Sequence, residues 1–144
     1  MRIKDFQKTF FFFLPFLAAL SCSDIKNEEP CGEIACTEEF VSLTISIKNA
    51  IGEPVQLDSY SAVLSETNKD IASELADFDK DSFGENGIYV IFNDRYVKEF
   101  ENKSTSLQFR GIKDAQEIVS AKFEVGADCC HVKLISGDRD IVIP

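Results

Sequence analysis

The sequence predicts an all-β fold, an antiparallel β-sandwich of about seven strands, behind a short N-terminal leader. Several short segments alternate apolar and polar residues with a period of two, the pattern of strands that bury one face and solvate the other. Glycine, asparagine or aspartate follows most of these segments, as expected for tight turns between neighbouring strands. The stretch 36–144 is long enough for one domain and too short for two.

The first 21 residues have the composition of an export signal. Arg2, Lys4 and Lys8 give a basic opening, and a largely apolar run follows from residue 9 to residue 20. A helix needs about 20 apolar residues to cross a hydrocarbon core of ~30 Å, so this run is too short to span a membrane. We therefore predict that residues 1–21 direct export and do not belong to the folded domain.

The end of this run resembles the lipobox of bacterial lipoproteins. It reads Leu17-Ala18-Ala19-Leu20-Ser21-Cys22, with Ala19 where that family usually has leucine. The resemblance implies that Cys22 carries several acyl chains, such as palmitate, and holds the protein at the outer membrane, on its periplasmic face or at the cell surface. Two alternatives are cleavage near Ala18 or Ser21, which would release a soluble protein, and retention of the uncleaved run as a weak anchor.

Residues 22–35 are predicted to form an acidic, solvated tether. The whole chain has 15 basic and 25 acidic residues, a net charge of −10; without Arg2, Lys4, Lys8 and Asp5 the balance is 12 against 24, or −12. This charge argues against nucleic acid as a partner, because phosphates need a basic footprint. It also argues against direct binding of anionic lipid head groups, so the acyl chains would provide the membrane contact.

The first two strands are predicted within residues 41–64. Apolar residues at 41, 43, 45 and 47 alternate with polar ones at 42, 44, 46 and 48, which makes this the clearest strand in the chain. Gly52 and Pro54 then end regular pairing. A second strand is expected to contain Tyr60, Ala62 and Leu64, followed by a polar turn at 66–70.

The segment from Ile71 to Phe83 is ambiguous. Ile71, Leu75 and Phe78 fall at helical spacing and Asp70 could cap a short helix, so we expect a loop with one helical turn. Residues 88–92 form a continuous apolar run, which suits a strand buried on both faces.

The remaining strands are predicted at 107–110, 119–125, 130–134 and 141–143. The first three alternate in the same way, and each is followed by a glycine within a few residues; the last is a short apolar run at the C-terminus.

Parts of this pattern resemble prealbumin-like, carboxypeptidase-regulatory-like sandwiches, which share the Ig-like type of architecture. Residues 44–55 are similar to their first strand and turn, and Gly87-Ile88-Tyr89-Val90 is similar to their glycine-tyrosine strand. The closing stretch 126–137 resembles the end of uncharacterised bacterial lipoproteins that contain such a domain. Because these domains are usually non-catalytic modules, the resemblance implies a binding or adhesion function.

Four cysteines remain once Cys22 is assigned to lipid. Cys31, Cys36, Cys129 and Cys130 are an even number in an exported chain, so two disulfides are expected. Neighbouring residues of a strand point to opposite faces, and a bridge between adjacent cysteines is strained and rare. Cys129 and Cys130 should therefore each pair with one N-terminal cysteine, in either of two combinations.

Two metal hypotheses were weighed, and neither is favoured. His131 lies beside Cys129 and Cys130, but the cysteine spacing does not fit a zinc site and oxidation would remove the thiolates. Asp77, Asp79 and Asp81 resemble the start of a calcium loop, yet the residues that should supply its glycine and its glutamate are Ser82 and Ile88. We expect no metal and no cofactor.

The sequence favours a non-catalytic protein. It contains one histidine, no tryptophan and no G-x-S-x-G, phosphate-loop or zinc-hydrolase motif. An envelope protein or glycan partner is instead expected to bind loops near 71–86 and 95–104. The candidate contact residues are Phe78, Phe83, Tyr96 and Phe100, although at least half of them are expected to lie in the core. The main alternative is a structural subunit that joins a larger outer-membrane complex through a sheet edge.

Overall fold

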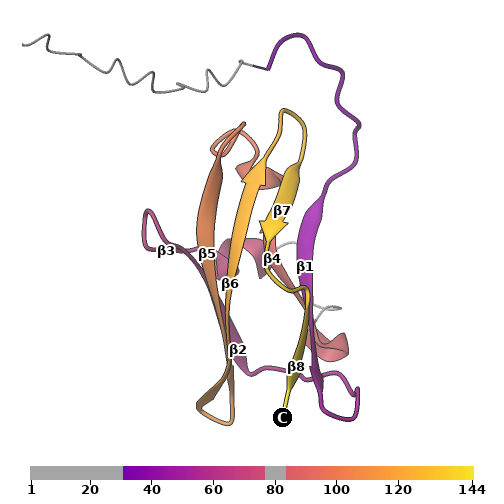
Figure 1. The fold of residues 1–144 in the computed structure, drawn as a ribbon, viewed down its shortest axis with the longest axis vertical. Coiled ribbons are helices and arrows are strands. Elements are labelled where there is room, and N and C mark those ends of the chain that lie inside the picture. The colour runs from indigo at the N-terminus through magenta and orange to yellow at the C-terminus, as the bar shows by residue number, and fades with distance from the viewer. Residues whose placement is uncertain (1–30, 77–83) are drawn as a thin grey trace, which may run out of the picture.

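The computed structural model describes residues 31–76 and 84–144, which form a two-layer β-sandwich (Figure 1). The predicted signal, most of the tether, Phe78, Phe83 and the three aspartates of the calcium hypothesis lie outside the described residues. The elements in chain order are β1 (Ser42–Asn49), β2 (Ser59–Leu64), β3 (Lys69–Asp70), α1 (Ala72–Ala76), η1 (Gly84–Asn86), β4 (Ile88–Asn93), η2 (Asp94–Tyr96), β5 (Ser104–Lys113), β6 (Gln116–Ala127), β7 (Val132–Ser136) and β8 (Asp140–Ile143).

The smaller sheet has three strands in the order β4-β1-β8. β1 pairs antiparallel with β4 and parallel with β8. The central position of β1 explains its strict alternation: Leu43, Ile45 and Ile47 are buried, whereas the side chains between them face outward. β4 is buried at five of its six positions, as its continuous apolar sequence predicts.

The larger sheet has five strands in the order β3-β2-β5-β6-β7, and all its pairs are antiparallel. β5 and β6 form a long hairpin whose two-residue turn, Asp114-Ala115, has φ values of 50° and 60°. Positive φ at both positions gives a turn whose twist matches that of paired strands. The chain changes sheet between β1 and β2, β3 and β4, β4 and β5, and β7 and β8.

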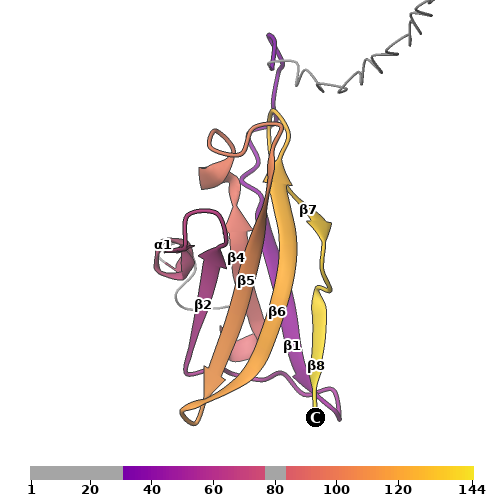
Figure 2. The same ribbon diagram turned by 60° about the vertical axis from the view of Figure 1, so that its left-hand side comes forward.

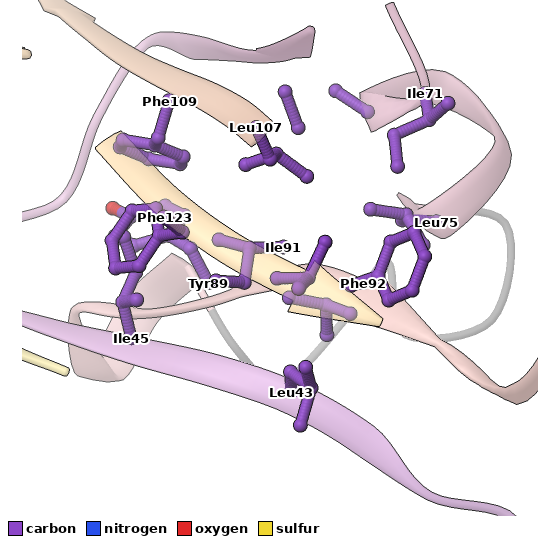
Figure 3. Packing of buried hydrophobic residues seen from close by; sticks show 14 of the residues in the cluster. Leu43, Ile45, Ile71, Leu75, Tyr89, Ile91, Phe92, Leu107, Phe109 and Phe123 are labelled. Carbon is purple, nitrogen blue, oxygen red and sulfur yellow. The ribbon is translucent and has the colours of Figure 1, made fainter. Parts of the chain in front are cut away.

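The core lies between the two sheets and is rich in aromatic rings (Figure 3). Tyr60 stacks on Phe109 with ring centroids 5.4 Å apart, and Phe92 stacks on Tyr96 at 5.1 Å. The Tyr89 hydroxyl accepts from the Leu57 N–H at 2.7 Å and donates to the Val55 carbonyl at 2.9 Å. Tyr89, from β4, therefore holds the connection between β1 and β2 in place. Each ring buries a large apolar area in fixed geometry, and the pairs add to that stabilisation.

The structure confirms the predicted all-β sandwich, with differences in detail. The described residues contain eight strands, including the two-residue β3 that the sequence did not reveal, and the β1–β8 pair is parallel. The expected helical turn is α1, which packs against β4 and β2 (Figure 2). Asp70 caps it, because its Oδ1 accepts from the Ala72 N–H at 3.0 Å.

Different segments of the chain meet at the two ends of the sandwich (Figure 1). The segment that enters β1, the turn from β6 to β7 and the residues after η2 gather at one end, here called the disulfide end. The β1–β2 loop, the β5–β6 hairpin turn and the C-terminus gather at the opposite end, here called the hairpin end.

Candidate functional site

Two disulfides close the disulfide end. Cys31 is bonded to Cys129 and Cys36 to Cys130, with Cα–Cα distances of 5.5 and 5.3 Å. Each joins the segment before β1 to the turn before β7, and the sequence separations are 98 and 94 residues. The prediction that each late cysteine pairs with one early cysteine is confirmed, and the structure selects one of the two combinations.

The backbone around Cys129 and Cys130 differs from the sequence-based expectation. Both cysteines lie in a turn before β7, which begins at Val132, so they are not neighbours within a strand. The turn is held by Asp128, whose Oδ1 accepts from the N–H groups of Cys130 and His131 at 2.8 and 2.9 Å. These two hydrogen bonds, that from His131 first, lower the pKa of Asp128 because they stabilise its charged form. The carboxylate thus holds the backbone of the turn that contains both late cysteines.

Asp94 connects both sheets at this end. It is the first residue of η2, directly after β4, and its side chain is only 10% exposed. Its Oδ2 accepts from the Val41 N–H at 2.8 Å and lies 2.7 Å from His131 Nδ1, while its Oδ1 accepts from the Val132 N–H at 2.8 Å. One carboxylate therefore fixes the entry to β1, the entry to β7 and the imidazole ring. Hydrogen bonds to a charged acceptor are stronger than neutral ones, so Asp94 is a structural centre of this end.

His131 extends this network to Thr37, the residue directly after Cys36. Its Nε2 lies 2.8 Å from the Thr37 hydroxyl oxygen. A carboxylate can only accept, so Nδ1 carries a proton toward Asp94, and Nε2 shares a hydrogen bond with the Thr37 hydroxyl. The order hydroxyl, imidazole, carboxylate is that of an acyl-transfer triad.

The surroundings of this network favour a structural role over nucleophilic catalysis. An acyl-transfer site needs hydrogen-bond donors aimed at a developing oxyanion. Here the backbone N–H groups of Val41 and Val132 donate to Asp94, and those of Cys130 and His131 donate to Asp128. These four N–H groups are thus already used within the protein, and the network links three segments of chain.

Sequence reasoning found the cysteines and His131 but missed Asp94, Thr37 and Asp128. Only Asp128 has a local signal, since an aspartate two and three residues before its backbone donors is the pattern of an Asx turn. Asp94 and Thr37 are 37 and 94 residues from His131 in sequence. Nothing in the local sequence connects residues at such distances.

Two of the four aromatic residues predicted to contact a ligand, Tyr96 and Phe100, lie in the described part of the chain, and neither is at the surface. Tyr96 is 3% exposed and Phe100 is 6% exposed, and both rings pack on Phe92 in the core. This removes Tyr96 and Phe100 from the candidate contact residues, because rings in the core cannot meet a partner, and it agrees with the expectation that at least half of the four are buried. The Tyr96 hydroxyl donates to Glu74 at 2.6 Å, and burial, together with that carboxylate, raises the pKa of Tyr96. Both rings instead anchor the segment after η2 to the sandwich.

No three His, Cys, Asp or Glu side chains in 31–76 and 84–144 converge on a point where an ion would be held. Within the same ranges no helix has the length and apolar character needed to cross a bilayer.

Comparison with protein-family models, curated proteins and solved structures gives no match to this chain.

Proposed function

We propose that this protein is a lipid-anchored component of the cell envelope whose sandwich acts as a non-catalytic binding or adhesion module. The anchor is Cys22, acylated at the outer membrane, and the residues that follow it tether the domain. The observation that carries the proposal is the position of the two disulfides. One fastens Cys31, in the last part of the predicted tether, and the other fastens Cys36, the first residue after it, to the same end of the sandwich.

The disulfides give the proposed anchor a defined geometry. Cys22 precedes Cys31 by nine residues, and nine residues reach at most about 30 Å. The disulfide end would therefore stay near the membrane, and the hairpin end would face away from it. The segment 95–104, expected from sequence to bind a partner, lies at the disulfide end, where the backbones of Phe100 and Ala127 are hydrogen-bonded. Recognition far from the membrane would fall instead to the hairpin end and the sides of the sheets.

Rigidity at the anchored end supports a mechanical role. The two disulfides, the Asp94 hydrogen bonds and the His131–Thr37 contact hold the entry to β1 against the turn before β7. A load on the tether would thus pass into both sheets at once, since β1 belongs to one sheet and β7 to the other. An adhesion module or an assembly subunit needs this kind of attachment, whereas a soluble enzyme does not.

Fatty-acid labelling tests the anchor. Cells that express the full chain are grown with an alkyne analogue of palmitate, and the label is measured in membrane and soluble fractions. We expect label and membrane recovery for the wild type and for the control Ser23→Ala, and the loss of both for Cys22→Ala. Label that persists in Cys22→Ala, or an unlabelled wild type in the soluble fraction, would contradict the proposal.

The kind of partner distinguishes the alternative, a structural subunit, from a binding module. In that case the protein would be recovered from detergent-solubilised membranes with another envelope protein at fixed stoichiometry. A binding module would instead retain a soluble glycan or peptide. One side of the sandwich gives this alternative specific support, because strand edges are open there.

A further inference from the structure

The sandwich has an open side between β6 and β8. β6 is twelve residues long, but β7 pairs with it only from Glu124 to Ala127. β7 then leaves the larger sheet, and the chain continues as β8 beside β1 in the other sheet (Figure 1). The stretch 116–123 of β6 therefore has β5 on one side and no strand of the described residues on the other.

Gly137 is the residue at which the chain leaves the larger sheet after β7. Its φ is +117°, a conformation that L side chains rarely adopt, and a Cβ there would overlap the ring of Phe123. The departure of β7 is thus built into the sequence at this position. Gly137 still lies against the Lys122 carbonyl, since a Cβ there would be 3.0 Å from that oxygen, so the open edge of β6 runs from Gln116 to the N–H of Lys122.

The free edge of β6 exposes backbone groups at known positions. The N–H groups of Ser65 and Asp58 donate to the carbonyls of Ser106 and Ile112, so the even-numbered residues of β5 bond toward β2 and the odd-numbered ones toward β6. The partners of those odd residues are Phe123, Ala121 and Val119. Alternation along an antiparallel pair then directs the N–H and C=O groups of Ser120 and Lys122 away from β5, toward the open side.

β8 presents a second free edge to the same space. The Ser46 N–H donates to the Arg139 carbonyl at 2.6 Å, which directs the backbone of residues 139, 141 and 143 toward β1. The N–H and C=O groups of Asp140 and Val142 therefore point away from β1. A groove runs between the two edges, and its lining residues are Ala121, Lys122, Gly137, Asp138, Asp140, Ile141 and Val142.

The composition of the groove indicates what would fill it. Ala121 and Ile141 give an apolar floor, and Val142 is 66% exposed at the rim. Unpaired strand edges bind other strands, with backbone hydrogen bonds for affinity and alternate side chains for specificity. Two carboxylates and one ammonium group line the groove, and the whole chain has a net charge of −10. Electrostatic complementarity favours a cationic strand and disfavours a second copy of this acidic chain.

We propose that this groove is a strand-addition site for an extended segment of a partner protein whose side chains alternate between apolar and lysine or arginine. The segment pairs with the Ser120–Lys122 edge and extends the larger sheet where β7 departs. The proposal rests on the structural-subunit alternative of the proposed function, to which the open strand edges give support, but it does not depend on the acyl anchor. Failure of lipid labelling would remove the anchor and leave this site intact.

Amide exchange on the unmodified full-length chain, in detergent micelles, tests the site directly. The probe is an acetylated and amidated heptapeptide of alternating lysine and valine, and the control has glutamate in place of lysine. We expect the lysine peptide to slow exchange of the Ser120, Lys122 and Val142 amides at least tenfold, and the glutamate peptide to leave them unchanged. Equal effects of both peptides, no protection, or protection confined to another edge would overturn the proposal.

Two variants at one position separate backbone pairing from charge. Lys122→Pro removes the outward N–H and should weaken binding of the lysine peptide at least tenfold by fluorescence anisotropy. Lys122→Gln keeps the N–H and removes the single ammonium group, so it should bind the peptide at least as tightly as the wild type. Weaker binding by Lys122→Gln than by Lys122→Pro would contradict strand addition. Concentration-dependent protection of the same amides without peptide would show that a second copy is the occupant, which also overturns the proposal.

Discussion

Removal of one disulfide should lower the free energy of unfolding by much less than half of the loss caused by removal of both. In the chain-entropy model, a bridge stabilises by closing a loop in the unfolded chain, and the loop closed by Cys31–Cys129 spans 98 residues. That closure is worth about 4.7 kcal/mol. Once it exists, the Cys36–Cys130 bridge closes only a small ring of about seven residues, because 36 − 31 is 5 and 130 − 129 is 1. The additional closure is worth about 2.4 kcal/mol.

The two bridges are therefore predicted to be strongly non-additive. Either bridge alone still closes the long loop, so each paired serine variant, Cys31→Ser with Cys129→Ser or Cys36→Ser with Cys130→Ser, should lose about 2.4 kcal/mol. The variant that lacks both should lose about 7 kcal/mol. Small domains have a total stability of roughly 5–15 kcal/mol, so the variant without bridges would be close to unfolded.

Equilibrium unfolding in guanidinium chloride, followed by circular dichroism, measures these losses. Every protein, the reference included, carries Cys22→Ser so that no fifth thiol can exchange with the bridges. If the double loss equals the sum of the two single losses within about 0.5 kcal/mol, the loop-closure reasoning is refuted. Strain or local contacts would then dominate the contribution of the bridges.

Three further results are expected from the geometry. Asp94→Ala removes three hydrogen bonds to a charged acceptor and should lower the free energy of unfolding by about 3 kcal/mol or more. The exposed control Asp138→Ala should change that free energy by less than about 0.5 kcal/mol. Urea titration measures both. Gly87→Ala places a Cβ 2.5 Å from a carbonyl oxygen of β1 at a φ of +67° and should lower the melting temperature, whereas Gly84→Ala, with nothing within 4 Å, should not. The lowered pKa of Asp128 means that its contribution is complete above the unfolded-state value of about 3.9 and is lost as pH falls through the folded-state pKa, so acid titration of unfolding should be less steep for Asp128→Asn.

The disulfide end shows why burial matters when aromatic residues are assigned to function. Tyr96 and Phe100 follow a predicted strand end, where loops often carry binding residues. In the structure Tyr96 stacks on Phe92 and Phe100 meets the same ring edge-on, and the segment between them closes the sandwich. A single sequence does not distinguish these situations, because an aromatic ring in a short loop is equally suited to a core and to a contact surface.

The proposed anchor and the proposed groove assign different tasks to different parts of the molecule. The disulfide end would transmit force between the membrane and both sheets, whereas the open side between β6 and β8 would recognise a partner strand. The hydrogen bonds of Asp94 and the bridges stabilise only the first, and the departure of β7 at Gly137 creates only the second. The two tasks can therefore be disrupted separately.

The sequence by itself determined where the longer strands lie and which of their faces are buried. A strand alternates its side chains with a period of two, so burial of one face is recorded in neighbouring residues, as in β1 and in the stretch of β6 up to Val125. The even number of late and early cysteines likewise predicted two bridges, and Asp70 marked the start of α1.

Only the tertiary structure decided how these strands are arranged. The parallel pairing of β8 with β1, the choice of Cys31–Cys129 over the other combination and the contact between Asp94 and His131 all join residues far apart in sequence. Such contacts depend on which sheet a strand enters and at which register, and these are set by packing of the whole core. The open edge of β6 follows from the same cause, since it exists only because β7 ends its pairing early and the chain continues in the other sheet.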